Sequence, residues 1–153
     1  MVMVEEKGRV RPPLPADRAE WVRMRHALWP TEDPAELDAE LGAWLSSPTR
    51  QVYVAERERG DLCGFIELGL REYAEGCVTS PVGFIEGWYV DPDVRKRGIG
   101  RALVAAGEAW ARGKGCTEMG SDTWIDNALS QRAHEALGYR VAERLIAFAK
   151  RIG

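Results

Sequence analysis

Residues 95–103, RKRGIGRAL, combine two glycines with several basic side chains at a point where a helix is expected to begin. The glycines are Gly98 and Gly100, and the basic residues are Arg95, Lys96, Arg97 and Arg101. The first N–H groups of a helix have no partner within the helix and lie at the positive end of its dipole. Glycines let those N–H groups approach an anion, so the segment is suited to a pyrophosphate. A solvated glycine-rich turn with a basic edge is the alternative interpretation.

The spacing of the glycines argues against two familiar phosphate-binding loops. No Gly-Lys-Ser/Thr follows, which excludes a Walker A loop. The GxG pattern has no third glycine and comes late in the chain, so it fits a dinucleotide fingerprint poorly.

Two acidic residues lie in or after expected strands, where a carboxylate could take the proton of an amine. Glu86 interrupts an apolar strand and needs a partner, either an arginine of this chain or an incoming ammonium. Asp122 follows a strand expected to run parallel to the one that ends at Val90, and ligands bind beyond the carboxyl ends of such strands. A helix cap is the alternative role for Asp122, and Asp126 competes for it. Glu67 lies in another strand and is a rival base.

The hydrophobic pattern predicts a mixed sheet flanked by helices. Helices are expected over residues 16–29, 33–47 and 127–137, and a further helix is opened by residues 95–100 and ended by Gly113 or Gly115. Strands are expected over 8–11, 51–56, 62–70, 82–90, 117–123 and 139–151. Asp33 is the expected N-cap of the second helix, and Gly138 is the expected C′ residue of the last. Residues 1–7 are predicted to be a flexible N-terminal extension and residues 8–153 a single domain.

Composition limits the classes of partner. The chain has 153 residues and a net charge of −3, which argues against nucleic acid and leaves a cationic ligand open. No apolar run approaches the roughly 20 residues that span a bilayer, and MVMVEEKG lacks the apolar region of a secretory signal. The cysteines Cys63, Cys77 and Cys116 have no metal-type spacing, so we expect a reduced cytoplasmic protein without a metal.

The succession of strand, V-D-P-x-x-R-x-x-G-x-G, amphipathic helix, strand, helix and A-L-G-Y resembles the Gcn5-related N-acetyltransferase superfamily from about Gly8 onward. The resemblance implies the α/β acetyltransferase fold, of the α+β type. In this fold, about four helices flank a central mixed, mostly antiparallel sheet with a splayed parallel strand pair. It also implies acetyl-coenzyme A as cosubstrate. Its pyrophosphate would bind the glycine turn, and its pantetheine arm would lie beside the strand whose last residues are GWYV. The residues so implied are Trp88, Tyr89, Val90, Arg95, Lys96, Arg97, Gly98, Ile99, Gly100 and Arg101.

Further stretches resemble the aminoglycoside 6′-N-acetyltransferase branch of that superfamily. They are ALWP at 27–30, SPVGFIEGWYV at 80–90, GCTEMGSDTWIDNALSQRAHEALGY at 115–139 and AER at 142–144. This resemblance implies a homodimer that acetylates the 6′-amine of an aminoglycoside by direct attack on the thioester and so confers antibiotic resistance. The implied sugar contacts are Trp29, Tyr73, Glu86, Asp122 and Glu143, with Glu86 and Asp122 as the candidate catalytic carboxylates and Asn127 as a coenzyme contact.

Several alternatives stay open at the level of sequence. By pattern alone, Trp29 fits a hydrophobic core and Tyr73 a solvated loop, while Trp21, Trp44 and Trp110 fit helix stripes. The acceptor could instead be another small amine, a polyamine or a protein N-terminus, or the chain could be a non-catalytic acyl-coenzyme A sensor. Where many of the superfamily have a tyrosine, this chain has His134, so the general acid is open. The choice between Glu86 and Asp122 as the main base is also open.

Overall fold

The computed structural model describes residues 9–153, which divide into two compact units. One unit ends at Ser121, and the other runs from Asp122 to Gly153. The predicted N-terminal extension, residues 1–7, lies outside the described residues. The single domain over residues 8–153 stays a prediction, and each unit is described here by itself.

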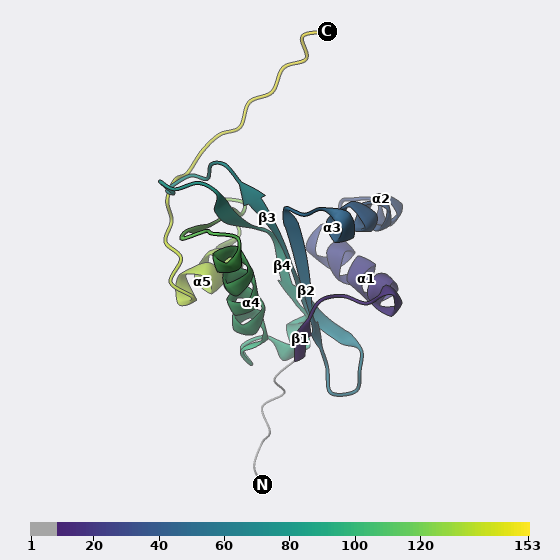
Figure 1. The fold of residues 1–153 in the computed structure, drawn as a ribbon. Coiled ribbons are helices and arrows are strands. Elements are labelled where there is room, and N and C mark those ends of the chain that lie inside the picture. Colours follow the sequence, from purple (N-terminus) through teal and green to yellow (C-terminus); the bar gives the residue numbers. More distant parts are fainter. Residues whose placement is uncertain (1–8) are drawn as a thin grey trace. The chain divides into compact units, whose positions relative to one another are not determined.

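A five-stranded sheet in the order β1-β2-β3-β4-β5 forms the centre of the first unit (Figure 1). The strands are β1 Arg9–Arg11, β2 Arg50–Glu56, β3 Leu62–Arg71, β4 Val82–Val90 and β5 Met119–Ser121. Neighbouring strands from β1 to β4 are antiparallel, whereas β4 and β5 are parallel. The parallel pairing ends at Ile85 and Ser121, although β4 continues to Val90. This confirms the predicted mixed, mostly antiparallel sheet with a splayed parallel pair.

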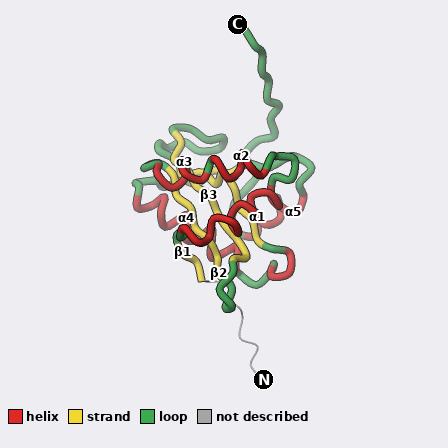
Figure 2. The backbone as a smooth tube through the Cα atoms, turned by 90° about the vertical axis from the view of Figure 1, so that its right-hand side faces the viewer, coloured by secondary structure: helices red, strands yellow, loops and turns green. Residues whose placement is uncertain are grey.

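Four α-helices belong to the first unit and cover both faces of its sheet. They are α1 Arg18–Leu28, α2 Pro34–Ala39, α3 Leu41–Ser46 and α4 Ile99–Gly113, with short 3₁₀ turns η1 Pro15–Asp17 and η2 Pro92–Val94. Figure 1 places α1, α2 and α3 on one face and α4 on the other, and Figure 2 shows the first three crossing in front of the strands. In place of the single helix expected over 33–47, the structure has two short helices, α2 and α3, separated by Glu40. Asp33 caps the first of them as predicted, because its side chain accepts a hydrogen bond from Ala35 N at 2.9 Å.

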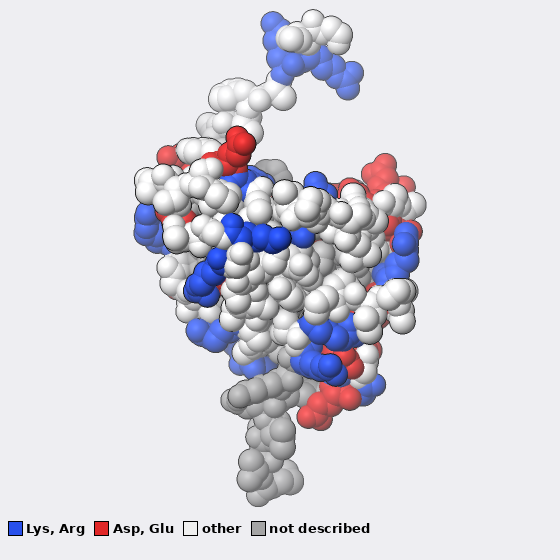
Figure 3. Space-filling model, viewed as in Figure 1, with Lys and Arg blue, Asp and Glu red and all other residues white. Residues whose placement is uncertain are grey.

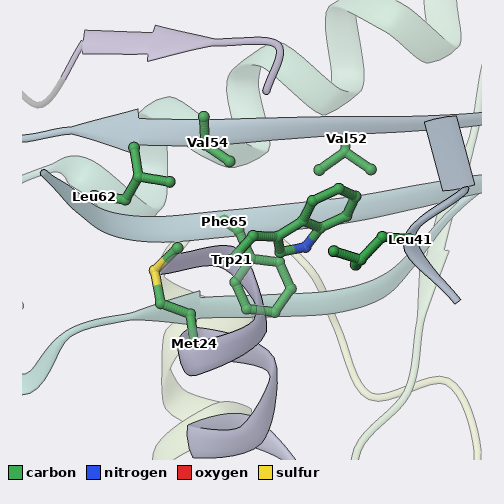
Figure 4. Packing of buried hydrophobic residues seen from close by; sticks show 7 residues of the cluster. All are labelled: Trp21, Met24, Leu41, Val52, Val54, Leu62 and Phe65. Atoms are coloured by element: carbon green, nitrogen blue, oxygen red, sulfur yellow. The ribbon is translucent and has the colours of Figure 1, made fainter. Parts of the chain in front are cut away.

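The core on the α1 side of the sheet is built from residues of β2 and β3 and of the helices that cover them. Figure 4 shows this cluster, in which residues of α1 and α3 pack against strand residues: Trp21, Met24, Leu41, Val52, Val54, Leu62 and Phe65. Burying each of the large side chains stabilises the fold by about 1.5–3 kcal/mol. The core therefore fixes α1 against the sheet.

The buried face of α4 differs from the sequence prediction. Helical spacing predicts that Ile99, Leu103, Ala106 and Trp110 line this face. Ile99 and Leu103 are buried, but Ala106 and Trp110 are only half-buried. Gly107 takes a buried position instead, because a Cβ there would lie 2.7 Å from a methyl group of Leu68. The helix thus approaches β3 closely at a residue that a hydrophobic pattern does not mark.

The second unit contains one helix, α5 Ala128–Ala136. The side chain of Asn127 caps it by accepting a hydrogen bond from Ser130 N at 3.1 Å, and Gly138 ends it with a φ of +90° as predicted. Residues 140–153 form neither helix nor strand, so the strand expected over 139–151 is absent. None of the helices in the described part of the chain combines the length and apolar character needed to cross a bilayer.

Candidate active site

A cleft of about 390 Å³ opens in the first unit, between the helices α1 and α3 and the strands β2 to β4. Its lining includes four carboxylates, two guanidinium groups and two indoles. We call it the acidic cleft; its residues are Arg25, Trp29, Glu32, Glu40, Ala43, Trp44, Arg50, Glu67 and Glu86. Basic and acidic side chains are interspersed on the face drawn in Figure 3. A cleft with more carboxylates than cations favours a ligand that carries several ammonium groups.

A buried ion pair forms the floor of the acidic cleft. Glu67 on β3 is fully buried, and its Oε1 atom lies 2.8 Å from Arg25 Nε and accepts a hydrogen bond from Trp21 Nε1 at 3.0 Å. Burial raises the pKa of Glu67 to about 7, although Arg25 and Trp21 both act to lower it. Arg25 also donates to Glu40 Oε2 at 2.9 Å, so it links the floor to the wall of the cleft.

Trp29 contributes its ring to the cleft just after the end of α1. The guanidinium of Arg25 lies 5.2 Å from the ring centroid, and Phe65 meets the ring edge-on at 6.3 Å between centroids. A Cβ on Gly87 would lie 2.8 Å from Trp29 Cη2, so the indole packs directly on the backbone of β4. Trp29 is half-buried, and these contacts fix its orientation in the cleft.

Glu86 lies in a β-bulge of β4. On either side of it, Gly87 pairs with Glu67 and Ile85 pairs with Leu68, which leaves Glu86 without an opposite residue on β3. Its carboxylate is half-buried and accepts two hydrogen bonds from Arg71, from Nε to Oε1 at 3.0 Å and from Nη2 to Oε2 at 2.8 Å. In the structure the ion pair that the sequence left as an alternative is therefore present, and Glu86 also lines the acidic cleft.

The glycine turn, residues 95–100, precedes α4. The backbone conformation and the packing of this turn also require glycine, apart from any access for an anion. Gly98 has a φ of +88°, a left-handed conformation that side chains disfavour. A Cβ on Gly100 would lie 3.1 Å from the ring of Trp88. The N–H groups of the first turn of α4 have no acceptor within the helix, by helix geometry. Lys96, Arg97 and Arg101 are exposed around this turn.

The end of β4 is held by a network around Asp91 that the sequence did not point to. Asp91 is buried and accepts hydrogen bonds from Arg23 at 3.0 Å, from Arg57 at 3.1 Å and from Tyr89 Oη at 3.0 Å. Burial alone would raise the pKa of Asp91, but hydrogen bonds from Arg23 and Arg57 hold it below its ordinary value. The network fixes the backbone just before the glycine turn.

Arg95 folds back on the same strand end. Its Nε donates to the carbonyl of Val90 at 2.9 Å, and its guanidinium lies 5.9 Å from the ring centroid of Tyr89. Trp88 faces α4, where it packs against Gly100, whereas Tyr89 packs against the α1-side core. The two residues therefore point to opposite faces of the sheet.

This arrangement of sheet, glycine turn and helix has known counterparts. Residues 18–139 match the sequence model of the acetyltransferase (GNAT) family. The chain belongs to the GNAT family. It is 43% identical to an aminoglycoside N(6′)-acetyltransferase type 1 of Klebsiella aerogenes over 92% of this chain and 95% of that protein. An aminoglycoside N(6′)-acetyltransferase type 1 of Stenotrophomonas maltophilia is 40% identical, over 95% of each chain.

Solved GNAT structures agree with this assignment. The acetyltransferase AAC(6′)-Iy in complex with CoA superposes with a TM-score of 0.92 at 34% identity, over 99% of this chain and 100% of that chain. The same protein in complex with the bisubstrate analogue CoA-S-monomethyl-acetylneamine has a TM-score of 0.89 at 35% identity, over 94% and 98% of the two chains. The predicted family, its aminoglycoside branch and its fold are confirmed.

The sugar contacts predicted for this GNAT chain fall into both units. Trp29 and Glu86 line the acidic cleft, while Tyr73 is 66% exposed in the loop after β3 and does not line it. Asp122 and Glu143 belong to the second unit and are exposed. The roles of all five residues stay predictions.

The remaining residues of interest in the second unit are on or near α5. Asn127 caps the helix with its side-chain oxygen, so neither Asp122 nor Asp126 has that role. His134 Nδ1 lies 2.7 Å from the carbonyl of Ser130, one turn earlier, as expected of a histidine on a helix face. The side chain of Trp124 is exposed.

Four charged residues of the cleft were not singled out as site residues from the sequence: Arg25, Glu32, Glu40 and Arg50. For Arg25 a signal was present, because it lies four residues from both Trp21 and Trp29 on the buried face of α1. A charged residue on such a face must have a partner. Trp44, which was expected in the core, is half-buried and lines the cleft.

Proposed function

We propose that this chain transfers the acetyl group of acetyl-coenzyme A to the 6′-amine of aminoglycosides and thereby confers resistance to them. The acidic cleft carries this proposal, because three accessible carboxylates, those of Glu32, Glu40 and Glu86, lie beside two tryptophans and suit a ligand made of sugar rings with ammonium groups. The GNAT relatives named as aminoglycoside N(6′)-acetyltransferases support the same acceptor.

The reaction forms an amide bond between the acceptor nitrogen and the acetyl carbon and breaks the carbon–sulfur bond. The acceptor must lose a proton before it attacks, and the departing sulfur takes one up. Glu86 and Asp122 are the proposed carboxylates that orient the ammonium and accept its proton, directly or through water. The remaining ammonium groups are proposed to bind Glu32, Glu40 and Glu143, which fixes the amine that faces the thioester.

The sugar rings are proposed to pack on aromatic faces. Trp29 is held by Arg25, Phe65 and Gly87, so its indole is already oriented before the acceptor binds. Trp44 lines the same cleft, and Tyr73 is the proposed third aromatic contact. Aromatic rings that are fixed in advance lose little conformational freedom on binding.

The coenzyme is proposed to bind at the end of β4 and the start of α4. The free first-turn N–H groups of α4 and the exposed Lys96, Arg97 and Arg101 suit its pyrophosphate. Beyond Ile85, the edge of β4 that faces away from β3 pairs with no strand in the described residues, and there it can pair with the amides of the pantetheine arm. Acetyl-coenzyme A supplies the activated thioester carbonyl. Arg95 and Asn127 complete the proposed contacts.

The chain is also proposed to act as a homodimer in the cytoplasm. Residues 140–153 carry the exposed apolar side chains Val141, Leu145, Ile146 and Phe148, and an extended segment of this kind gains stability from a partner strand. No disulfide joins Cys63, Cys77 or Cys116, as suits a reducing compartment. Sedimentation velocity of the full chain, compared with a chain ending at Tyr139, tests the dimer.

The acceptor is tested by thiol release with acetyl-coenzyme A and two matched compounds, neamine and its analogue with a 6′-hydroxyl. We expect turnover of neamine and almost none of the analogue, because a hydroxyl is a weaker nucleophile at neutral pH and carries no charge for Glu86. Mass spectrometry should show one added acetyl group, and NMR should place it on the 6′-nitrogen. Comparable turnover of both compounds would contradict the regiochemistry. Turnover of simple polyamines alone would contradict the aminoglycoside acceptor.

A further inference from the structure

The carboxylate of Glu86 already has a cation bound to it. Arg71 donates to both of its oxygens, at 3.0 Å and 2.8 Å, in the two-point arrangement that matches a guanidinium to a carboxylate. The side chains of Arg71 and Glu86 are 41% and 28% exposed, so the pair is open to ligands. An acceptor ammonium that binds Glu86 meets this guanidinium first.

The ion pair is supported by its surroundings. Arg71 is the last residue of β3, and its guanidinium stacks 3.5 Å from the ring centroid of Phe84. On β3, a Cβ on Gly69 would lie 3.3 Å from Glu86 Oε1, so the glycine leaves room for the carboxylate. The bulge at Glu86 and the absent side chain at Gly69 together direct the carboxylate toward Arg71.

Glu86 also lines two hollows of the first unit. The second hollow has a volume of about 410 Å³ and shares Trp44, Arg50 and Glu86 with the acidic cleft. Arg71 lines only the second hollow. Both hollows therefore reach Glu86, and in the second one Arg71 occupies both of its carboxylate oxygens.

We propose that Arg71 is a specificity-determining residue that occupies the ammonium position of Glu86 in the free protein and is displaced from it by the acceptor. This inference rests on the proposed function of the acidic cleft. A guanidinium and an ammonium compete for the same two oxygens and repel each other. A lone amine gains one contact by displacing Arg71, whereas a polyamine is first held by the other carboxylates and competes at a high local concentration. Arg71 therefore selects acceptors with several ammonium groups.

The test is calorimetric titration of neamine into the coenzyme A-loaded protein, because binding does not require Glu86 to support turnover. We compare the wild-type chain with Arg71→Ala, Glu86→Gln and the double variant. Arg71→Ala should bind neamine about three- to fivefold more tightly, because this factor in affinity corresponds to the free energy of an exposed ion pair. In the Glu86→Gln background the same substitution should change the affinity little, since the site of competition is gone.

Arg50→Ala is the matched control, because it removes the same charge from the second hollow, which Arg50 and Arg71 both line, without removing the partner of Glu86. Arg50 stacks on Trp44 at 4.7 Å instead. Its effect on neamine affinity should be equal in the wild-type and Glu86→Gln backgrounds. A monoamine such as glucosamine should gain more from Arg71→Ala than neamine does.

Weaker or unchanged neamine binding by Arg71→Ala would overturn the inference, since it would show that Arg71 only orients Glu86. An equal gain in both backgrounds would also overturn it, as an effect of net charge. Failure of the wild-type chain to bind any aminoglycoside would contradict the proposed function itself and the inference with it. The two failures are therefore distinguishable.

Discussion

Arg25 Nε lies 2.8 Å from Glu67 Oε1, and the two side chains are only 3% and 0% exposed. From this buried pair, Arg25 reaches Glu40 and the ring of Trp29, so one guanidinium contacts three residues of the acidic cleft. Solvent does not screen the pair, and removing one partner leaves a charge buried alone. The geometry of the cleft is therefore coupled to the stability of the fold.

Arg25→Met should lower the free energy of unfolding by about 3–5 kcal/mol at pH 8, because it leaves the Glu67 carboxylate without its cation. Urea unfolding measures the change. The double variant Arg25→Met/Glu67→Gln should recover much of the loss, since no buried charge remains. The control is Arg18→Met, which breaks the exposed pair with Asp38 and should have a much smaller effect. Equal losses in Arg25→Met and Arg18→Met would contradict the prediction.

The stability of the fold should depend on pH through Glu67. Burial raises the pKa of this carboxyl from 4.5 to about 7. The folded chain thus holds a proton that the unfolded chain has released, and the contribution of Glu67 to stability falls as the pH rises through this window. Relative to Glu67→Gln, the unfolding free energy of the wild-type chain should fall by up to about 1.4 kcal/mol per pH unit and then level off above the folded-state pKa. A difference that stays constant from pH 5 to pH 8 would show that Glu67 does not titrate there.

The fold was largely predictable because its elements depend on local patterns. Short apolar segments bounded by turn residues predict β2 to β4, and Asp33 and Gly138 mark helix ends through their own side-chain chemistry and backbone freedom. The prediction of a strand over residues 139–151 was wrong for a physical reason. A strand requires a hydrogen-bonded neighbour, and the pattern of residues 139–151 cannot say whether this chain supplies one.

The candidate site was less predictable, because its contacts join residues far apart in sequence. Glu86 was recognised as a carboxylate that needs a partner, but the choice of Arg71 depends on a bulge and on Gly69 across the sheet. Arg25 reaches Glu67 only because α1 packs on β3. Sequence spacing identifies which residues need partners, and tertiary packing decides which partners they have.

Gly100→Asp should abolish measurable coenzyme A binding, since the new side chain brings negative charge to the proposed pyrophosphate position and crowds Trp88. Gly100→Ala separates the two effects, because it adds the Cβ without the charge and should weaken binding less. Gly113→Asp is the control at the other end of α4, where a Cβ meets nothing within 4 Å. Calorimetry with coenzyme A gives the affinities, and circular dichroism verifies the fold. Unchanged affinity in a folded Gly100→Asp protein would remove the pyrophosphate from this turn.

Asp122→Asn should raise the KM for neamine or lower its turnover while leaving the KM for acetyl-coenzyme A nearly unchanged. The substitution keeps the size of the side chain and removes its charge, so it weakens only a charge-assisted contact to an ammonium. Such a contact contributes about 1.5–3 kcal/mol, which corresponds to a loss of about 10- to 150-fold in kcat/KM for the acceptor. Asp126→Asn is the control, because it removes an exposed carboxylate four residues further along the same segment and should have little effect. Steady-state kinetics with each substrate varied in turn separates the outcomes. Equal losses for both substrates would indicate a general defect, and no loss for either would exclude Asp122 from the acceptor site.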